Sequence, residues 1–423
     1  MGPRRRLLSL LFFFSFAPFA RATGVFPVRH KYLHHKRPIA DLRSHDVRRH
    51  GRILSAVDLP IGGVGLPTDT GLYFAEIGIG TPPKTYYVQV DTGSDILWVN
   101  CVTCTRCPKK SDLGIELTLY DPKGSHSGSL VSCNENFCTS TYGGEIEGCS
   151  PNNPCQYSVM YGDGSSTAGY FVTDVVEYNQ VSGNHRTTPA NASVSFGCGA
   201  QQSGDLGSSS EALDGILGFG QSNSSMISQL AAAGRVRKVF AHCLDTVKGG
   251  GIFALGNVVE PKVKTTPLIP NMPHYNVNLR AIEVAGAFLR LPTDLFENGD
   301  KKGTIIDSGT TLSYLPEAAY KPLLNADDVY CVGWQNGGMQ SKDGKDMFLL
   351  GDLALSNKLV LYDLENQVIG WTEHNCSSSI QIKDDKTGAI FTVDAHNISS
   401  AHRLEVGMSI LLLLIIMICY LSC

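Results

Sequence analysis

Two stretches of this sequence decide the fold: YVQVDTGS at residues 87–94 and GTIIDSGT at residues 303–310. In each, apolar and β-branched residues lead to Asp, a hydroxyl residue, Gly and a second hydroxyl residue, and an apolar run follows. The two acids, Asp91 and Asp307, lie 216 positions apart. A repeat at this distance predicts two similar lobes rather than a solenoid.

The repeated motif suits a paired-carboxylate site. Gly93 and Gly309 allow each turn to approach its counterpart closely. The neighbouring hydroxyl side chains can bond locally and hold each carboxylate in place. A single Asp-Thr-Gly is weak evidence because these residues are common in turns. Two copies, each between apolar strands, are much more specific.

Each copy has a second half, GILGFG at residues 215–220 and FLLGD at residues 348–352. Alone, either would be an ordinary core strand. Paired with an Asp turn, each is predicted to run beside that turn and exclude water. Between the halves of the first copy, YGDGS at residues 161–165 predicts a hairpin tip. A Gly-rich tip that carries Tyr161 suits a mobile lid over a cleft, although a plain surface hairpin is the alternative.

These motifs resemble, in the same order, those of the pepsin-like aspartic proteases. The cysteine-rich insert that follows Asp91 resembles the plant nepenthesin-like branch, and the apolar C-terminus resembles its GPI-anchored members. The resemblance covers about residues 59–401. It implies a mostly β, bilobal fold with the substrate cleft between the lobes.

The resemblance also implies the chemistry. Asp91 and Asp307 would share one proton, which is this family's own established device, since like charges this close cannot both ionise. One carboxylate would act as general base on a water, and the other would donate to the scissile carbonyl at acidic pH. The remaining implied roles are Ser94 and Thr310 bonded to the outer carboxylate oxygens, Thr92 and Ser308 tying the turns together, and Tyr161 with Gly162 closing over the peptide. A monomer with a peptide or protein substrate, no metal and no organic cofactor is expected.

Composition and charge agree with this class. Val, Ile, Thr and Tyr runs separated by Gly predict mostly β-structure, with short helices at residues 225–234 and 316–325. Residues 23–52 hold eight Lys or Arg and two acids, whereas the chain beyond them carries about −14 charges. A basic N-terminal segment can bind an acidic body at neutral pH and dissociate from it when the carboxylates become protonated on acidification. The alternative is that this segment is a disordered arm. The acidic body argues against nucleic-acid binding.

Both ends indicate the secretory pathway and the extracellular side of the plasma membrane. A basic start, an apolar run and Ala20-Arg21-Ala22 predict a signal peptide, since about 14 apolar residues are short for a membrane span. The uncharged residues 406–423 follow a small-residue triplet and a polar spacer, which predicts a GPI signal with attachment at Ser399. The spacer is short, so a single C-terminal transmembrane helix stays open.

The sequence also predicts glycosylation sites and domain boundaries. Asn-x-Ser/Thr patterns add four candidate glycosylation sites: Asn191, Asn223, Asn375 and Asn397. The boundaries are a signal peptide (1–22), a basic propeptide (23–66), an N-terminal lobe (67–262), a C-terminal lobe (263–376), a stem (377–400) and a GPI-type signal (401–423).

The cysteines favour disulfides. Of 13, two lie in the apolar tail, and seven of the other 11 crowd into residues 101–155. The spacing Cys101-x-x-Cys104-x-x-Cys107 also suits zinc, but no His-x-x-x-His partner lies nearby and the route is oxidising. Spacing alone leaves the pairing open, and the odd number needs an explanation.

The lobes differ in length. Asp91 lies 127 positions before Gly218, but Asp307 lies only 44 before Gly351. The helical pattern that ends at Asn325-Ala326 breaks off without a closing signal. The family resemblance implies a cysteine after this helix, paired with the one that matches Cys331, and here it is missing. Deletion of one cysteine-bearing block, as in a splice variant or a faulty gene model, explains both observations.

Three functions follow for a chain of this kind. The motifs support an active acid endopeptidase. The short second lobe supports a catalytically impaired isoform that binds peptides or proteins, because loss of a few hundred Å² of burial at about 25 cal/mol per Å² is comparable with a domain's stability. A non-enzymatic, inhibitor-like relative would usually lack one Asp turn. A serine hydrolase is disfavoured, since no Gly-x-Ser-x-Gly occurs.

Overall fold

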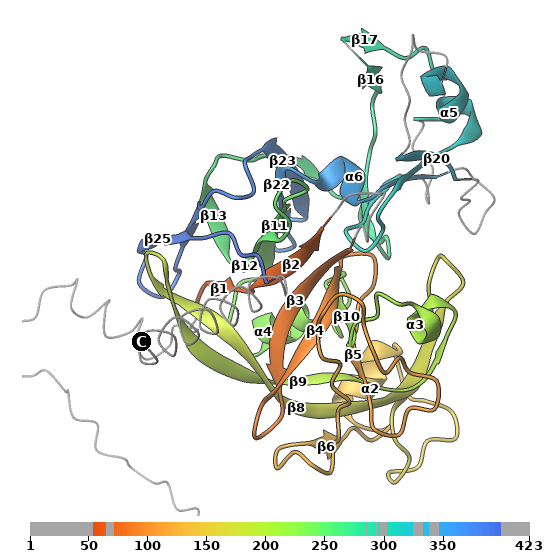
Figure 1. Ribbon diagram of the computed structural model, residues 1–423, viewed down its shortest axis with the longest axis vertical. Coiled ribbons are helices and arrows are strands. Elements are labelled where there is room, and N and C mark those ends of the chain that lie inside the picture. The colour runs from red at the N-terminus through yellow and green to blue at the C-terminus, as the bar shows by residue number, and fades with distance from the viewer. Residues whose placement is uncertain are drawn as a thin grey trace, which may run out of the picture. The chain divides into compact units, whose positions relative to one another are not determined.

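The computed structural model in Figure 1 describes residues 54–64, 72–284, 286–292, 295–296, 303–324, 333–337 and 347–398. The predicted signal peptide, Ser399 and the terminal apolar segment lie outside these residues. Strands dominate the described chain, as predicted, and two helices lie where the apolar periodicity placed them. The described helices are α2 (Asn136–Thr141), α3 (Asp205–Ser208), α4 (Met226–Ala232), α5 (Glu317–Leu324) and α6 (Asp352–Leu355).

One 15-stranded sheet runs through most of the described chain. Two of its strands, β6 (Ser129–Leu130) and β7 (Gln156–Met160), pair with β8 beside the main path. Along the path the strands are β14 (Lys264–Pro267), β23 (Val368–Glu373), β22 (Lys358–Asp363), β11 (Val239–Leu244), β12 (Gly251–Leu255), β1 (Val57–Asp58), β8 (Ser166–Gly183), β9 (Arg186–Ser203), β5 (Leu97–Asn100), β10 (Gly215–Gly218), β4 (Lys84–Asp91), β3 (Leu72–Ile79) and β2 (Ile61–Val64).

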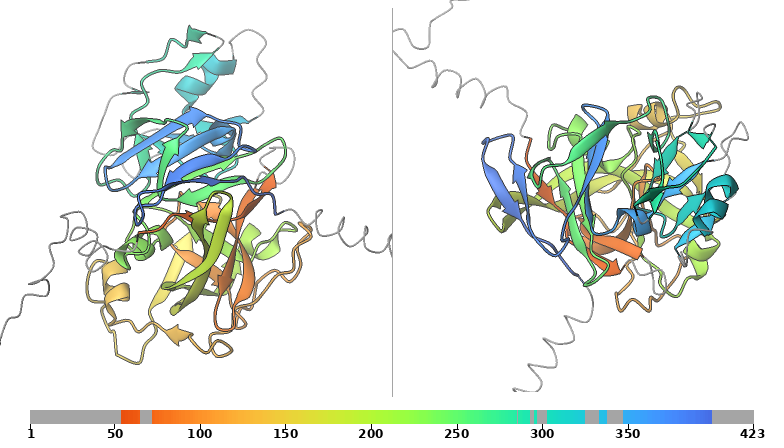
Figure 2. Two further views of the ribbon diagram at one scale, coloured as in Figure 1. Left: turned by 90° about the vertical axis from the view of Figure 1, so that its left-hand side faces the viewer. Right: turned by 90° about the horizontal axis from the view of Figure 1, so that it is seen from above.

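The sheet curls over its own core in the N-terminal half, where β8 pairs with β3 as well as with β9. Alternate side chains of β8, among them Val172, Val176 and Tyr178, are buried because successive strand residues face opposite sides. In the left view of Figure 2 these strands, orange to yellow-green, lie below the blue strands from near the C-terminus. Large apolar side chains such as Phe196 and Phe253 fill the interior.

A second, five-stranded sheet belongs to the C-terminal lobe, and a two-stranded hairpin lies apart from it. The hairpin consists of β16 (Glu283–Val284) and β17 (Ala287–Phe288). The five strands, in spatial order, are β15 (Tyr275–Val277), β18 (Thr304–Ile306), β21 (Phe348–Leu350), β19 (Ser313–Leu315) and β20 (Trp334–Asn336).

The internal repeat of the sequence is confirmed as a structural repeat. In the first copy β4 lies parallel to β10, which is antiparallel to β5. In the second copy β18 lies parallel to β21, which is antiparallel to β19. Gly218 stands opposite Asp91 in the first ladder. Each apolar-apolar-Gly segment is therefore a strand beside its Asp turn, as predicted.

The first described residues are integral to the large sheet, although the expected propeptide runs to residue 66. β1 lies between β12 and β8 and pairs with both in antiparallel orientation. Val57, Leu59 and Ile61 are fully buried. The site of propeptide removal stays a prediction.

Residues 377–398, the expected stem, contain two strands packed against the body. β24 (Ile380–Lys383) and β25 (Ile390–Val393) form a three-stranded sheet with β13 (Asn257–Glu260). Ile380 and Ile382 are buried because apolar and polar residues alternate along β24. The end of this segment meets the start of the body: His396 Nε2 lies 2.8 Å from Asp58 Oδ2.

The disulfide prediction is confirmed, and the zinc alternative is wrong. All ten cysteines in the described part of the chain are in disulfides, and the odd one, Cys331, lies outside that part. Three bridges lie within the cysteine-rich insert, and one that spans 133 positions joins β11 to the residues after β23. The pairs are Cys101–Cys198, Cys104–Cys107, Cys133–Cys149, Cys138–Cys155 and Cys243–Cys376.

Candidate active site

The two Asp turns make the same local hydrogen bonds. The Gly93 amide donates to Asp91 Oδ1 at 2.7 Å, and the Ser94 hydroxyl donates to Asp91 Oδ2. In the other turn the Gly309 amide donates to Asp307 Oδ1 at 2.8 Å, and Thr310 Oγ1 donates to Asp307 Oδ2 at 2.7 Å. Ser94 and Thr310 thus each bond the carboxylate of their own turn. Each carboxylate is held by a backbone amide and a hydroxyl, which fixes its orientation.

The turns face each other closely. A Cβ on Gly93 would lie 2.5 Å from Asp307 Oδ2, and a Cβ on Gly309 would overlap Asp91 Oδ1. Only glycine leaves room for the opposite carboxylate at these two positions. Sequence reasoning placed both glycines here, and the structure brings the carboxylates together across them.

A cross-turn bond joins the lobes below the carboxylates. The Ser308 amide donates to Thr92 Oγ1 at 2.9 Å, and Ser308 Oγ donates to the Val90 carbonyl at 3.4 Å. Thr92 is fully buried and Ser308 nearly so. The spacing of the turns therefore depends on groups that water does not reach.

Burial and mutual charge dominate the electrostatics of the pair. Asp91 is 5% exposed and Asp307 9%. Burial, and then the charge of Asp307, raise the pKa of Asp91 to about 7 against the opposing effect of the hydrogen bonds from Ser94 and Gly93. A raised pKa is expected of one member of two close carboxyl groups, because the second charge is costly in a dry site. The pair therefore retains a proton at mildly acidic pH.

The predicted lid is the hairpin of β7 and β8. Tyr161 at its tip accepts a hydrogen bond of 2.7 Å from Trp98 Nε1 of β5. Burial raises the pKa of Tyr161, and the charge of Asp91 adds to the effect. The tyrosine therefore reaches from the hairpin toward the carboxylates. Gly162 next to it is exposed, with no atom within 4 Å of an added Cβ.

A third buried carboxyl group lies near the pair and had no role in the sequence interpretation. Asp352, the first residue of α6, is 2% exposed. Its amide donates to the Thr310 carbonyl at 2.8 Å. Burial raises its pKa well above the usual range, and the charges of Asp307 and Asp91 add to this. The signal was visible, since this acid directly follows an apolar strand and Gly351.

Two more side chains brace the turns through their carbonyls. Gln89 Nε2 donates to the Gly309 carbonyl at 3.2 Å and so bridges the two lobes. His274 Nδ1 lies 3.0 Å from the Gly93 carbonyl. Gln89 could have been noticed as a polar residue in an apolar strand. Nothing in the local sequence marks His274.

The other predicted sites are placed only in part. The four candidate glycosylation residues Asn191, Asn223, Asn375 and Asn397 are all exposed. Ser399 lies outside the described residues. None of the described helices is long and apolar enough to cross a membrane. In the same part of the chain, no group of three His, Cys, Asp or Glu side chains is arranged to hold a metal ion.

Comparisons with known proteins agree with this arrangement of the site. Aspartic proteinase 36 of Arabidopsis thaliana is 47% identical across 93% of this chain and 92% of that protein. The chain belongs to the plant aspartic proteinase family. Aspartic proteinase 39 of the same plant is 44% identical across 91% of each, and nepenthesin-2 of Nepenthes gracilis is 32% identical across 66% of this chain and 60% of that protein. The predicted class, an aspartic endopeptidase, is the class that these names print.

Family models and solved structures agree on the fold. Models described as "Xylanase inhibitor N-terminal" and "Xylanase inhibitor C-terminal" match residues 73–257 and 274–326. The crystal structure of edgp superposes with a TM-score of 0.59 at 19% identity, covering 76% of this chain and 95% of that chain. Basic 7S globulin from soybean gives 0.57 at 19% identity, covering 76% and 96%. At this identity they show the fold alone, and the predicted pepsin-like β fold is confirmed.

Gly309→Ala is expected to lower cleavage of a denatured protein at acidic pH by at least about 100-fold, because a Cβ there forces the carboxylates apart. The matched control is Gly144→Ala in the cysteine-rich insert, where an added Cβ meets no atom within 4 Å. Rates would be measured with a fluorescent casein. Equal rates for the two variants would contradict the close approach of the turns.

Proposed function

We propose that this chain is an aspartic endopeptidase that hydrolyses peptide bonds at acidic pH, with Asp91 and Asp307 acting together on a water molecule. The observation that carries the proposal is the meeting of two buried carboxyl groups across Gly93 and Gly309. One carboxyl group keeps a proton, and the other is ionised. The ionised group takes a proton from water as the water attacks the carbonyl carbon. The protonated group donates to the carbonyl oxygen, which gives a tetrahedral diol. As the C–N bond breaks, the carboxyl group that took the proton from water gives it to the leaving nitrogen, and the other carboxylate takes a proton from the diol, so the pair returns to its starting state.

The surroundings fit a peptide as substrate. Tyr161 and Gly162 close over the bound chain from the hairpin of β7 and β8, and Trp98 holds the tyrosine in place. Ser94 and Thr310 keep the carboxylates oriented toward the water between them. We place the enzyme as a monomer that acts on peptides or proteins and requires no metal or organic cofactor.

The cysteine-rich insert supports assignment to the nepenthesin-like branch. Three disulfides lie wholly inside residues 101–155, directly after the Asp91 strand. The similarity to nepenthesin-2 also supports this assignment. The insert packs its buried cysteines with Phe171 and Trp98, so it supports the base of the lid.

Asp91→Ala and Asp307→Ala are each expected to reduce cleavage by at least about 1,000-fold, since neither carboxyl group can perform both proton transfers alone. The protein would be produced without residues 399–423, and pepstatin-sensitive cleavage of a denatured protein would be measured after acidification. In the parent protein, cleavage is expected to fall as pH rises toward about 7, where Asp91 loses its proton. Activity that persists in either variant, or that peaks at alkaline pH, would contradict the mechanism.

The same raised pKa has a stability consequence. Between pH 3.8 and about 7 the folded protein keeps a proton on Asp91 that the unfolded chain has released. Stability therefore falls as the pH rises through this window. In Asp91→Asn this contribution should be absent. The unfolding temperature of the variant, measured across the same pH range, should therefore depend less on pH than that of the parent protein.

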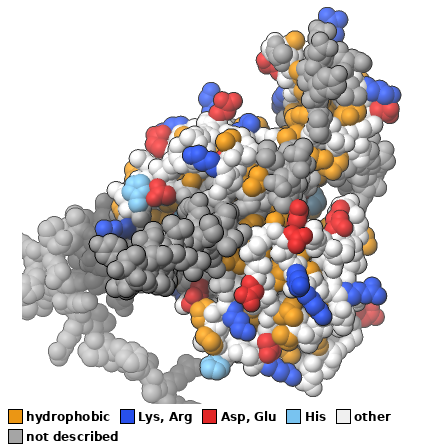
Figure 3. Space-filling model, viewed as in Figure 1, with side chains coloured by type: hydrophobic (Ala, Val, Ile, Leu, Met, Phe, Trp, Pro, Cys, Tyr) orange, Lys and Arg blue, Asp and Glu red, His pale blue; other side chains and the backbone are white. Residues whose placement is uncertain are grey.

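A second candidate is a catalytically impaired, shortened isoform that binds peptides or proteins. The match to the C-terminal family model ends at residue 326, next to the predicted join. The alignment with Aspartic proteinase 36 runs over 448 positions, although 93% of 423 residues is only about 393. Apolar side chains near β16, β17 and α5 are poorly covered, with Phe288 67% exposed, and Figure 3 shows such side chains at the surface there. An inhibitor-like role, after the name of the family models, is less favoured because both Asp turns are intact.

Inserting the corresponding segment of Aspartic proteinase 36 between Asn325 and Ala326 separates these candidates. If the second lobe is short of strands, the insertion should raise the unfolding temperature by several degrees, since about 1 kcal/mol shifts it by about 2–4 °C in a domain of about 150–250 residues. Cleavage should rise at least about ten-fold under the shortened-isoform proposal. The same insertion in Asp307→Ala should gain stability but no activity. An unchanged rate and unfolding temperature would reject the deletion.

We further propose that the chain enters the secretory pathway and is held at the extracellular face of the plasma membrane by a GPI anchor at Ser399. The glycosylation candidates are all exposed, which is compatible with this route. Phosphatidylinositol-specific phospholipase C should release the full-length protein from plant membranes into the supernatant. Protein that remains in the pellet, and is released only by detergent, would indicate the transmembrane helix instead.

A further inference from the structure

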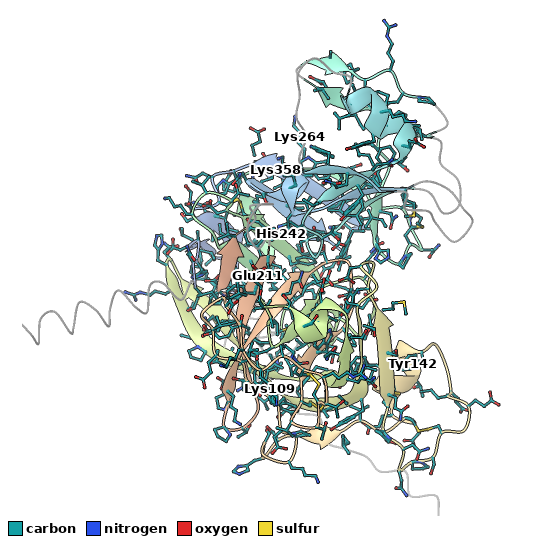
Figure 4. All side chains as sticks on the ribbon, turned by 45° about the vertical axis from the view of Figure 1, so that its right-hand side comes forward. Lys109, Tyr142, Glu211, His242, Lys264 and Lys358 are labelled. Atoms are coloured by element: carbon teal, nitrogen blue, oxygen red, sulfur yellow. A yellow bond between two sulfur atoms is a disulfide. The ribbon has the colours of Figure 1, made fainter. Side chains whose placement is uncertain are left out.

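We propose that His242 and Tyr362 form a buried positioning pair that holds the Asp91 turn at the spacing its partner turn requires. The inference rests on the proposed function and deepens it. The pair lies in the large sheet, outside both Asp motifs. Figure 4 labels His242 in the interior of the molecule, between the strands of the two halves.

The strand register brings the two side chains together. β11 and β22 are antiparallel, with Phe240 opposite Tyr362 and His242 opposite Val360. His242 and Tyr362 are thus diagonal neighbours on one face of the sheet, within reach for aromatic side chains. His242 Nε2 lies 3.0 Å from the Tyr362 hydroxyl, and both residues are 0% exposed.

The tyrosine hydroxyl points at the base of the carboxylate pair. Burial raises the pKa of Tyr362, and the charges of Asp307 and Asp352 raise it further, whereas a hydrogen bond with the Thr92 side chain lowers it. The hydroxyl therefore lies beside Thr92, and both buried acids are near enough for their charges to act on it. Thr92 Oγ1 is the atom that accepts the Ser308 amide at 2.9 Å. A chain of polar contacts thus runs from β11 through Tyr362 and Thr92 to the other Asp turn.

The ring of Tyr362 has little freedom to move. It stacks on Phe240 with centroids 4.4 Å apart and planes at 5°, and meets Tyr275 edge-on at 4.7 Å. Tyr275 is itself tied by a hydroxyl bond of 2.6 Å to the Phe219 carbonyl. Close packing of this kind fixes the hydroxyl to a fraction of an ångström.

Histidine is a costly residue for this place unless its hydrogen bond matters. Its Nδ1 has no hydrogen-bond partner among the described residues, and an unpaired buried polar atom is unfavourable. Burial lowers the pKa of His242 to about 3, so the ring stays neutral at mildly acidic pH. A neutral imidazole can hold the Tyr362 hydroxyl without adding a positive charge below the carboxylates. An apolar side chain would pack as well but would leave the hydroxyl free to turn.

The test compares Tyr362→Phe and His242→Leu with His242→Gln, which keeps a hydrogen-bonding group, and with Tyr120→Phe. Tyr120 is a buried tyrosine remote from the site whose hydroxyl donates to Asp174 Oδ2 at 2.7 Å. Tyr362→Phe and His242→Leu should lower kcat about ten-fold with KM unchanged, since the turns lose their alignment but the cleft does not. The alkaline limb of their pH–rate profile should move to lower pH, because carboxylates that drift apart repel less. His242→Gln should restore most of the rate, and Tyr120→Phe should lose stability alone.

A second readout does not depend on catalysis. Hydrogen exchange of the peptide that contains the Ser308 amide should quicken in Tyr362→Phe and not in Tyr120→Phe, because the amide loses its fixed acceptor. If the parent protein cleaves nothing, the proposed function fails and this exchange decides the positioning role alone. The proposal is overturned if Tyr362→Phe behaves like Tyr120→Phe in exchange, or in kcat and pH profile when the parent is active.

Discussion

Repulsion between two carboxyl groups buried at close range is the constraint around which this molecule is organised. Separate charges in a dry site would drive Asp91 and Asp307 apart, so the surrounding structure must hold them together. Glycine at positions 93 and 309 removes the side chains that would keep the turns apart. The bond from the Ser308 amide to Thr92 Oγ1 fixes the remaining distance. Burial, and then the charge of Asp307, raise the pKa of Asp91, so the pair keeps a proton that relieves part of this repulsion.

The two sheets serve this constraint in different ways. The N-terminal turn is the end of a long strand in a 15-stranded sheet with a large aromatic core. The C-terminal turn follows a three-residue strand in a five-stranded sheet. The first turn is therefore held by a larger sheet and a longer strand than the second. Gln89, in β4 of the larger sheet, donates to the Gly309 carbonyl of the second turn and so helps to hold that turn in place.

Sequence reasoning found the parts of the site that carry a local sequence signal, and missed those that depend on long-range pairing. Asp91 and Asp307 were accessible because the same motif occurs twice with matching strands on either side. Tyr161 was accessible through a Gly-rich hairpin signal, but its partner Trp98 was not, since the two lie 63 positions apart. His242 looks like one polar residue in a buried strand, and only the register of β11 with β22 shows what it contacts. The pairing of Cys243 with Cys376 and the place of β1 between β12 and β8 were hidden for the same reason, because long-range strand order leaves no local trace.

The meeting of His396 with Asp58 also bears on how the chain tolerates changes in length. Residues 396–398 bond back to Gly251 and Ile61, so the last described segment is fastened to the first. Residues 396–398 thereby link β12 and β2 of the large sheet. In the chain, the strands of the five-stranded sheet lie between β14 and β22, which both belong to the large sheet. A change of length between two strands that are each paired within the large sheet leaves those pairings in place. The smaller sheet is thus the part of the body where insertions and deletions disturb the least of the remaining strand pairing.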